Sequence, residues 1–393
     1  YINHLLQRIS PSPYMIIDRT RLLDPVHFEF RATLHPYQVQ AVRDLTARRF
    51  GVLEAPPGSG KTVMALAIIA RRKQPALIIV HTKELMYQWL KRSTEFLDIS
   101  EDEIGLIGDG RKQVGKKLTI GIINSLFKVI DEVRPTIGHL VVDECHHIPA
   151  KTFTEAVGTL DPAFMLGLSA TPYRRDKLTR IIYFYLGDRL HRIMPRQLQE
   201  MQRIMRATLK VRPTKCAYYF DSDEYQSMIS ALIADKKRNA LIANDVLEHT
   251  GDGRNGIALV ISDRVAHCEE LYRMISSKGR SVSLLTGAMP TAKRSELVEH
   301  LNGTKDHILV ATAQLIGEGF DLKALTSIFL ATPIKFTGRV KQYIGRILRV
   351  SEGKDEAVIY DYVDENGILK NSFHSRLLAY EEMGVNILPS SVQ

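Results

Sequence analysis

The stretch LEAPPGSGKT, residues 53–62, stands between an apolar run at 50–54 and a helix-prone run, VMALAIIARR, at 63–72. Glycines at 58 and 60 leave backbone amides able to point at phosphate oxygens, because no side chain blocks them. The helix that follows presents the positive end of its dipole to the same place. The stretch therefore predicts a phosphate-binding loop between a strand and a helix.

The same loop carries the side chains needed to hold a nucleoside triphosphate. Lys61 supplies a point charge for the β- and γ-phosphates, and the Thr62 hydroxyl is placed to ligate Mg²⁺. The full phosphate-loop pattern begins with glycine, whereas Ala55 stands at that position here. The loop residues expected to line the phosphates are Pro57, Gly58, Ser59 and Gly60. The expected ligands are ATP and Mg²⁺.

A second segment, HLVVDECHH at residues 139–147, supplies two adjacent carboxylates. Asp143 and Glu144 follow a buried-strand pattern, so we expect them at the carboxyl edge of a parallel sheet, where ligands of such sheets bind. Asp143 is placed to hold Mg²⁺, and Glu144 to orient and deprotonate the water that attacks the γ-phosphate. With Lys61, these residues predict a site of ATP hydrolysis.

The composition is that of a globular protein with more than one domain: 393 residues, 45% hydrophobic and 25% charged. No apolar run approaches the roughly 18 to 20 residues that a membrane span needs, and the first residues do not read as a secretory signal. Three cysteines, Cys145, Cys216 and Cys268, lie far apart, which argues against a disulfide framework and a zinc site. We expect a cytoplasmic location, with association with the nucleoid in a prokaryote and the nucleus as the alternative in a eukaryote. We also expect further domains or partners outside this chain.

The net charge of +9 and the pI near 9.3 favour a polyanionic partner such as nucleic acid. Lys and Arg concentrate in four clusters, at residues 71–73, 111–117, 174–177 and 236–238. Short charge runs are usually solvated, so we expect most of these clusters to be exposed surface.

Short β-branched runs alternate with helix-like segments in two series, a pattern that indicates parallel sheets covered by helices on both faces. The first series comprises residues 76–80, 118–123, 139–144 and 164–170. The second comprises 256–262, 281–285, 307–312, 327–332 and 357–363. Residues 185–250, between them, read as a basic, helix-leaning passage. The predicted divisions are a connector at 1–31, α/β domains at 32–205 and 206–370, and a helical tail at 371–393.

GSGKT at 58–62 and DECH at 143–146 together resemble the Walker A and Walker B elements of superfamily 2 helicases, the DEAD/DEAH-box group. Other segments resemble the family's remaining motifs in the correct order: LHPYQVQAV (34–42) the Q motif, IIVHTKELMYQW (78–89) motif Ia, GIINSL (121–126) Ib, LSATP (168–172) III, LVISDR (259–264) IV, ILVATAQLIGEGFDL (308–322) V and QYIGRILR (342–349) VI. DECH, LGLSATPYRRD and GEGFD look most similar to the branch containing XPB, UvsW, RadD and the helicase subunits of restriction enzymes. The resemblance implies tandem RecA-like domains with an ATP cleft between them.

The resemblance also implies roles for single residues. Gln38 would read the adenine base, and Arg346 and Arg349, three residues apart and so one helical turn, would be arginine fingers on the γ-phosphate. Gln342 belongs to the same catalytic segment. Gly319 and Asp321 would lie near the ribose. Contacts to the nucleic-acid backbone would come from Thr82, Ser125, Thr286 and Thr312. The link between ATP state and domain closure would be formed by Ser169, Ala170 and Thr171.

The expected function is an ATP-dependent translocase or helicase, acting on double-stranded or branched DNA in repair or defence. It would couple ATP hydrolysis to domain closure and stepping along the phosphate backbone. Two alternatives stay open on the sequence alone. One is an RNA helicase, whose core chemistry would look the same. The other is a nucleotide-gated switch or recruitment subunit that binds DNA and never separates strands.

Overall fold

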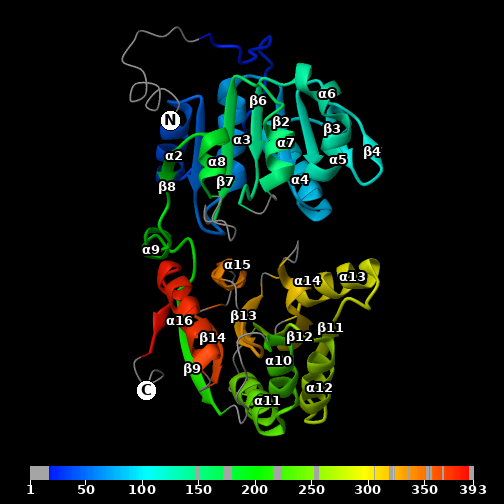
Figure 1. Cartoon of the computed structure of the whole chain (residues 1–393), viewed down its shortest axis with the longest axis vertical. Helices are drawn as coiled ribbons and strands as arrows, with labels where there is room; N and C mark the ends of the chain where they lie inside the picture. Colours follow the sequence, from blue (N-terminus) through cyan, green and yellow to red (C-terminus); the bar gives the residue numbers. More distant parts are fainter. Residues whose placement is uncertain are drawn as a thin grey trace. The chain divides into compact units, whose positions relative to one another are not determined.

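The computed structural model describes residues 17–146, 150–170, 179–215, 224–251, 256–304, 306–317, 322, 324–334, 337–350, 354, 356–364 and 367–388. The chain divides into two compact units, Tyr1–Met194 and Pro195–Gln393, each built around its own sheet (Figure 1). None of the helices in the described ranges combines the length and the apolar character of a membrane span.

The first unit holds an eight-stranded sheet in the order β4-β3-β5-β2-β6-β7-β1-β8. All neighbouring strands are parallel except β3 and β4. The strands are β1 (Phe50–Glu54), β2 (Ala76–Val80), β3 (Ile104–Gly108), β4 (Arg111–Lys112), β5 (Leu118–Ile122), β6 (His139–Val142), β7 (Phe164–Ser169) and β8 (Arg189–Arg192). Since β1, β6 and β7 run side by side in one direction, the residues that follow them meet at one edge of the sheet.

Helices cover both faces of this sheet. They are α2 (Pro36–Thr46), α3 (Lys61–Arg72), α4 (Lys83–Leu97), α5 (Ile123–Leu126), α6 (Ile130–Val133), α7 (Ala150–Val157) and α8 (Thr179–Leu186), with 3₁₀ turns at Glu101–Glu103, Phe127–Val129 and Arg134–Thr136. The helices α2, α3 and α4 contact one another in sequence, whereas α7 and α8 pack with Val52 of β1 in a separate apolar cluster. Strands buried on both faces explain the continuous apolar runs of the sequence.

The second unit holds a seven-stranded, all-parallel sheet in the order β11-β12-β10-β13-β14-β9-β15. The strands are β9 (Ala207–Thr214), β10 (Gly256–Ser262), β11 (Val282–Leu285), β12 (Asp306–Thr312), β13 (Leu325–Leu330), β14 (Ala357–Asp364) and β15 (Asn386–Ile387). Its helices are α9 (Pro195–Glu200), α10 (Tyr225–Ala234), α11 (Lys236–Gly251), α12 (Val265–Ser276), α13 (Thr291–Asn302), α14 (Ala313–Gly317), α15 (Thr337–Ile347) and α16 (Gly367–Glu382).

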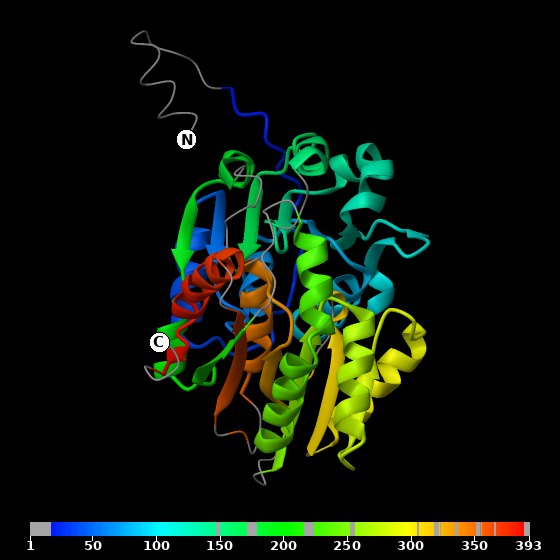
Figure 2. The same ribbon diagram turned by 60° about the horizontal axis from the view of Figure 1, so that its bottom comes forward.

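Alternation along β13 shows how the second sheet is covered on both faces. Phe329 packs in the apolar cluster formed with α11 and α12, which lie side by side in front of the strands in Figure 2. Ile328 and Leu330 point the other way, toward Val340 and Tyr343 of α15. The α15 and α16 helices contact each other on that second face.

The predicted α/β fold with two parallel sheets is confirmed, but one expectation for the connecting passage is wrong. Residues 185–250 contain two strands, β8 and β9, besides helices. The strand β9 was not predicted because Lys210 and Arg212 give its sequence a basic composition, although they alternate with the buried residues Leu209 and Val211. Lys210 Nζ lies 3.2 Å from the hydroxyl of Tyr360, and Arg212 pairs with Asp245 at 2.8 Å. Buried and half-buried residues alternate along β9, so the strand is amphipathic rather than polar.

Candidate active site

The phosphate-loop backbone has the shape that its glycines predict. Gly58 and Gly60 have φ angles of 83° and 81°, in the left-handed region, and Gly60 caps the N-terminus of α3. A Cβ atom at Gly60 would lie 2.4 Å from Nε2 of Gln38, so a larger residue would have to displace that side chain. Pro57 is half-buried, and Ser59, between the two glycines, is buried. The loop thus turns directly into the helix, with the helix N-terminus at the loop.

Lys61 is the first residue of α3, and its ammonium group is brought to the Walker B carboxylates. Its Nζ donates to the carbonyl of Ala55 at 3.1 Å and lies 3.4 Å from Oε1 of Glu144. The Lys61 side chain is 12% exposed and that of Glu144 is 21% exposed, so this ion pair is only partly screened by solvent. Glu144 has a φ of 43°, a sparsely populated conformation for a residue with a side chain. The structure therefore brings Lys61 and Glu144, both predicted from the sequence as site residues, into contact.

Asp143 is buried directly after β6 and is held by two hydrogen bonds. Its Oδ2 accepts a hydrogen bond from the indole N–H of Trp89 at 2.7 Å, and its Oδ1 accepts one from the backbone N–H of Glu144 at 2.9 Å. Burial, with the charge of Glu144 as a second cause, raises the pKa of Asp143 to about 6. The Trp89 contact was not predicted from the sequence, because α4 and the strand end are far apart along the chain.

The residues that follow β7 touch the same cluster. The backbone N–H of Ala170 lies 3.4 Å from Oε2 of Glu144, and the Ser169 hydroxyl lies 2.8 Å from Nδ1 of His146. That Nδ1 is also 3.4 Å from Oε2 of Glu144. Ala170 thus contacts Glu144 directly, and Ser169 is brought to it through His146, which the sequence analysis named only as part of the DECH segment. Thr171 lies outside the described residues.

Gln38, predicted to read adenine, is bonded to the phosphate loop. Its Nε2 donates to the carbonyl of Ser59 at 3.1 Å, and its Oε1 accepts from the backbone N–H of His35 at 2.9 Å. The neighbouring Tyr37 hydroxyl donates to the same Ser59 carbonyl at 3.2 Å. The α2 helix is thereby tied to the loop by two side chains, one of which, Tyr37, the sequence reasoning did not select.

The oxygen atoms present fit a magnesium ion. Mg²⁺ prefers carboxylate and hydroxyl oxygen, and Asp143 and Thr62, a half-buried residue in the first turn of α3, offer those groups. Ser59 Oγ is buried and makes no hydrogen bond, so a further polar atom of the loop is available to a ligand. A divalent cation would favour the ionised form of Asp143, which burial alone disfavours.

The remaining sites predicted in the first unit lie at ends of elements. Thr82 caps the N-terminus of α4, where its side chain accepts a hydrogen bond from the backbone N–H of Leu85. Ser125 lies half-buried in the short helix α5. The structure brings neither residue into the Lys61 cluster.

In the second unit the predicted residues are spread over the strand ends and α15. Thr286 follows β11, and Thr312 ends β12. Gln342 and Arg346 lie on α15, but Arg349 does not. The helix ends at Ile347, and the backbone N–H of Arg349 donates to the carbonyl of Arg346 at 3.3 Å, so the two arginines lie one turn apart although only Arg346 is within the helix. Arg349 instead pairs with Ile204 in an isolated antiparallel bridge. Gly319 and Asp321 lie outside the described residues.

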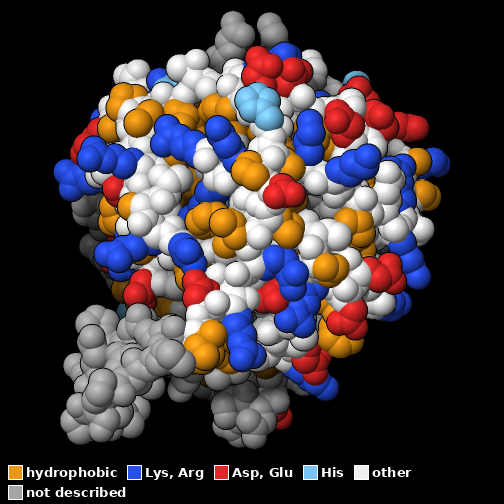
Figure 3. All heavy atoms as spheres, turned by 90° about the horizontal axis from the view of Figure 1, so that it is seen from above, with side chains coloured by type: hydrophobic (Ala, Val, Ile, Leu, Met, Phe, Trp, Pro, Cys, Tyr) orange, Lys and Arg blue, Asp and Glu red, His pale blue; other side chains and the backbone are white. Residues whose placement is uncertain are grey.

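The basic clusters are not all solvated. On the face in Figure 3, Lys and Arg side chains stand in separate groups among acidic and apolar ones. Arg72 bonds to the carbonyls of Leu45 and Arg48, and burial lowers its pKa to about 10. Arg238 is buried and pairs with Asp364 at 3.2 Å. The prediction of exposed surface is therefore wrong for these two arginines, which hold the fold.

Comparisons with known proteins agree with this arrangement. The family model for the type III restriction enzyme, res subunit, matches residues 31–174, and the helicase conserved C-terminal domain matches residues 221–351. These matches cover the loop and carboxylate segments in the first unit, and strands β10 to β13 with all of α15 in the second. The chain belongs to the superfamily 2 helicases, with one domain of each of these two kinds.

Two relatives match most of the chain. It is 26% identical over 397 residues, 97% of this chain and 72% of the relative, to a putative ATP-dependent RNA helicase of Acanthamoeba polyphaga mimivirus. It is 25% identical over 361 residues, 87% and 70%, to the ATP-dependent DNA helicase uvsW of Enterobacteria phage T4. A fragment of a putative HsdR subunit of a type I restriction enzyme from Vibrio vulnificus YJ016 shares the fold, with a TM-score of 0.69, 19% identity, and coverage of 91% and 68% of the two chains.

The predicted membership of superfamily 2, and the predicted kinship with UvsW and restriction-enzyme subunits, are confirmed. The chain is accordingly an ATPase, of the class of ATP-dependent helicases and translocases, and its substrate class is nucleic acid.

Proposed function

We propose that this chain is a motor that moves along double-stranded or branched DNA, driven by ATP hydrolysis at the cluster around Lys61. The observation that carries the proposal is the convergence of Lys61, Asp143 and Glu144 at one sheet edge, with Lys61 Nζ 3.4 Å from Glu144. A phosphate loop, a buried carboxylate and a second carboxylate beside a lysine are the parts that phosphoryl transfer to water requires.

In this proposal each residue has one task. Lys61 and the loop amides bind the phosphates, and Glu144 orients the attacking water and accepts its proton. Asp143 and Thr62 would hold Mg²⁺, which, when bound, neutralises charge that develops on the phosphates. Trp89 fixes the orientation of Asp143 through its 2.7 Å hydrogen bond.

The second unit would supply further positive charge to the γ-phosphate. Arg346 and Arg349 would reach the γ-phosphate when the two units close, and Gln342 would act beside them. An arginine delivered in this way accelerates phosphoryl transfer by about 10³ to 10⁵. Ser169 and Ala170, which touch His146 and Glu144, would transmit the nucleotide state to the closure.

DNA is proposed over RNA because the branch resemblance and the phage T4 relative, whose name states a DNA helicase, point to it. The mimivirus relative, a putative RNA helicase by name, supports the RNA alternative. In either case Thr82, Ser125, Thr286 and Thr312 would contact backbone phosphates, which carry no sequence information.

The test is a panel of substrates with two readouts. ATP turnover would be measured with single-stranded DNA, duplex DNA, forked DNA and RNA, beside displacement of a third strand from a triplex, which reports movement along a duplex. The proposal expects the greatest stimulation by duplex or forked DNA together with ATP-dependent triplex displacement. Greatest stimulation by RNA would favour the RNA helicase, and stimulation without movement would favour the switch.

A further inference from the structure

A buried carboxylate, that of Glu54, lies directly before the phosphate loop. Glu54 is the last residue of β1 and is 7% exposed. The next residue, Ala55, provides the carbonyl that accepts the hydrogen bond from Lys61 Nζ at 3.1 Å. A carboxylate that is removed from water needs charged partners, so the partners of Glu54 help to set where this carbonyl lies.

Two arginines of the edge strand β8 pair with this carboxylate. Arg189 Nη1 donates to Oε2 of Glu54 at 2.6 Å, and Arg192 Nε lies 3.0 Å from Oε1. Both arginines are exposed residues, so their guanidinium groups reach the buried carboxylate from the solvent side. Each carboxylate oxygen therefore has a cationic partner, and charge-assisted hydrogen bonds of this kind are the stronger ones in proteins.

A bulge in the pairing of β1 with β8 places both arginines on the same side as Glu54. Arg189 is the register partner of Val52, and Arg192 is that of Glu54. Between these two partners β8 contains one residue more than β1, namely Leu190. In a regular strand, residues three apart would point to opposite faces of the sheet. The bulge is therefore what allows two arginines to meet one carboxylate.

On its other face, β8 is fastened to α2. Nδ1 of His191 lies 2.7 Å from Oδ2 of Asp44, a residue in the last turn of that helix. The α2 helix is itself bonded to the phosphate loop through Gln38. The backbone N–H of Ile193 donates to the carbonyl of the last β1 residue at 2.9 Å, and the second unit begins two residues later. One short strand thus joins two supports of the phosphate loop to the place where the chain leaves the first unit.

We propose that Glu54 is a positioning residue for ATP hydrolysis and that it acts through Lys61. Its two arginines hold the end of β1 against β8, and the end of β1 sets the position of the Ala55 carbonyl. That carbonyl orients the Lys61 ammonium group, and a catalytic group that is misplaced by about 1 Å can cost about 10²-fold in rate. The inference rests on the proposed hydrolysis site around Lys61, and it holds for either kind of nucleic acid.

The test is a double-mutant cycle on ATP turnover. Glu54→Gln keeps the size of the side chain and removes its charge. The kcat should fall by about 10-fold because the strand end is no longer fixed, while KM should stay within about 3-fold because the loop amides remain. In the Lys61→Ala background the same change should lower kcat by less than about 2-fold, because its effect runs through the lysine.

Arginine variants repeat the test without removing the carboxylate. Arg192→Gln leaves Glu54 paired with Arg189, so the buried charge keeps a partner in the folded chain. Its kcat should fall by about 3- to 10-fold, and Arg192→Lys, which keeps a cation opposite the carboxylate, should stay within about 2-fold of the wild type. The matched controls are Arg92→Gln and Glu95→Gln, at an exposed ion pair of α4, and each should leave kcat within about 2-fold.

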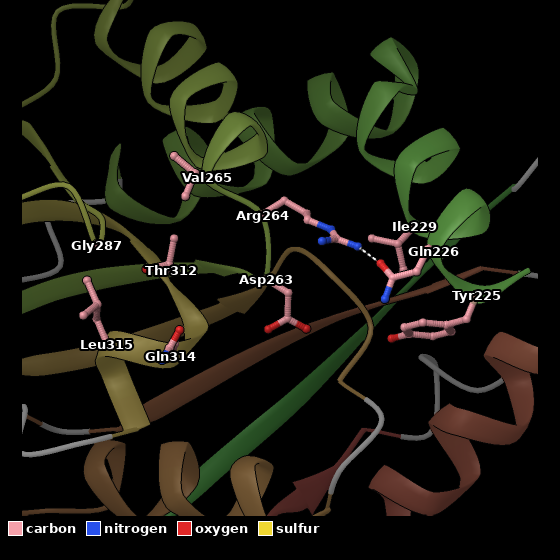
Figure 4. Close-up of a pocket in the computed structure, with 10 residues that line it drawn as sticks. All are labelled: Tyr225, Gln226, Ile229, Asp263, Arg264, Val265, Gly287, Thr312, Gln314 and Leu315. Carbon is pink, nitrogen blue, oxygen red and sulfur yellow. Dashed lines mark hydrogen bonds between the residues drawn. The ribbon is translucent and has the colours of Figure 1, made fainter. Parts of the chain in front are cut away.

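Binding of duplex DNA separates a positioning role from a general defect of the fold. Figure 4 shows a pocket lined by residues of the second unit, among them Thr312, and none of the variants changes this lining. The DNA affinity of Glu54→Gln should therefore stay within about 2-fold of that of the wild type. A loss of DNA affinity as large as the fall in kcat would overturn the positioning role.

The remaining outcomes distinguish this proposal from the hydrolysis site beneath it. Equal falls in kcat on Glu54→Gln with and without Lys61 would overturn the proposal and leave the hydrolysis site standing. Unchanged kcat in Glu54→Gln and Arg192→Gln, together with lower melting temperatures, would show that the pairing only stabilises the fold and would also overturn it. Turnover of Lys61→Ala within about 10-fold of the wild type would overturn both proposals.

Discussion

At the scale of residues, the hydrolysis site consists of side chains that short motifs identify and side chains that only the fold brings to them. Lys61, Asp143 and Glu144 could be predicted because each stands in a local pattern of loop or strand end. Trp89 could not, because its 2.7 Å bond to Asp143 joins residues 54 positions apart, and it depends on how α4 packs against β2 and β5. The same holds for the 2.8 Å contact between the Ser169 hydroxyl and Nδ1 of His146.

Replacement of Lys61 tests the assignment of the phosphate site. In Lys61→Ala the helix N-terminus and loop amides remain, so residual nucleotide binding is expected, while ATP turnover should fall by at least about 10²-fold because a charge partner of the transition state is lost. Lys91→Ala, at an exposed position of α4, serves as the control. Turnover of Lys61→Ala within tenfold of the wild type would remove Lys61 from the site.

Replacement of Trp89 tests the support of the proposed magnesium ligand. Trp89→Phe keeps a ring in the core and deletes the donor to Asp143, so the Mg²⁺ concentration for half-maximal turnover should rise by about 10- to 100-fold. Since the chain has one tryptophan, its fluorescence reports this site directly, and Mg²⁺ with ADP should change the wild-type emission. An unchanged Mg²⁺ requirement, or wild-type emission that does not change on addition of Mg²⁺ and ADP, would contradict the role of Trp89 in supporting Asp143.

At the scale of elements, strands whose residues are uniformly buried could be predicted from the sequence. The prediction of a strand failed where charged residues interrupt the apolar run. Residues 76–80 and 256–262 were predicted as strands and form β2 and β10 with those bounds. The β9 strand was not predicted, because Lys210 and Arg212 give its sequence the basic composition of a surface segment. The end of α15 was not predicted either, because no helix-terminating residue in the sequence marks Ile347 as the last helical residue before Arg349.

A buried lysine, Lys354, contacts backbone carbonyls at the end of α15. Lys354 Nζ donates to the carbonyl of Ile347, and it lies 3.3 Å from the carbonyl of Arg349. Burial lowers the pKa of Lys354 from 10.5 to about 7. Above pH 7 the folded chain therefore binds fewer protons at this residue than the unfolded chain does, and the free energy of unfolding rises with pH across that window.

The Lys354→Met variant tests this titration. Between pH 7 and pH 9 the free energy of unfolding of the wild type should rise relative to that of Lys354→Met by up to about 2 kcal/mol, because methionine does not titrate. Urea denaturation at both pH values measures the difference. Lys370→Met, an exposed lysine of α16, should behave like the wild type. A parallel pH response of wild type and Lys354→Met would refute the assigned pKa.

At the scale of the whole molecule, two sheets with a motif set in each could be predicted because the motifs recur in a fixed order along the chain. What the sequence did not predict was the internal bonding of each unit, such as the buried pair of Arg238 and Asp364, whose members are distant in sequence. This pair joins a residue of α11 to the last residue of β14, so it depends on which helix packs at which strand end.

Salt dependence tests the proposed contact to phosphates. If binding to duplex DNA runs through the backbone, the logarithm of affinity should fall linearly with the logarithm of salt concentration, with a slope near −0.9 for each phosphate neutralised. The net charge of +9 favours such binding. Titrations at several salt concentrations measure the slope, and tight binding with a flat response would point to stacking or base contacts alone.

The central claim is that arginines of the second unit complete the site of the first, and nucleic-acid-stimulated ATP turnover tests it most directly. Arg346→Ala and Arg349→Ala should bind ATP within a few fold of the wild type, because Lys61, Thr62 and Asp143 are intact, yet their stimulated turnover should fall by about 10² to 10⁴. Basal turnover without nucleic acid should change less. Equal loss of basal and stimulated turnover, together with a lower melting temperature, would show that the arginines are structural and would contradict closure of the two units around ATP.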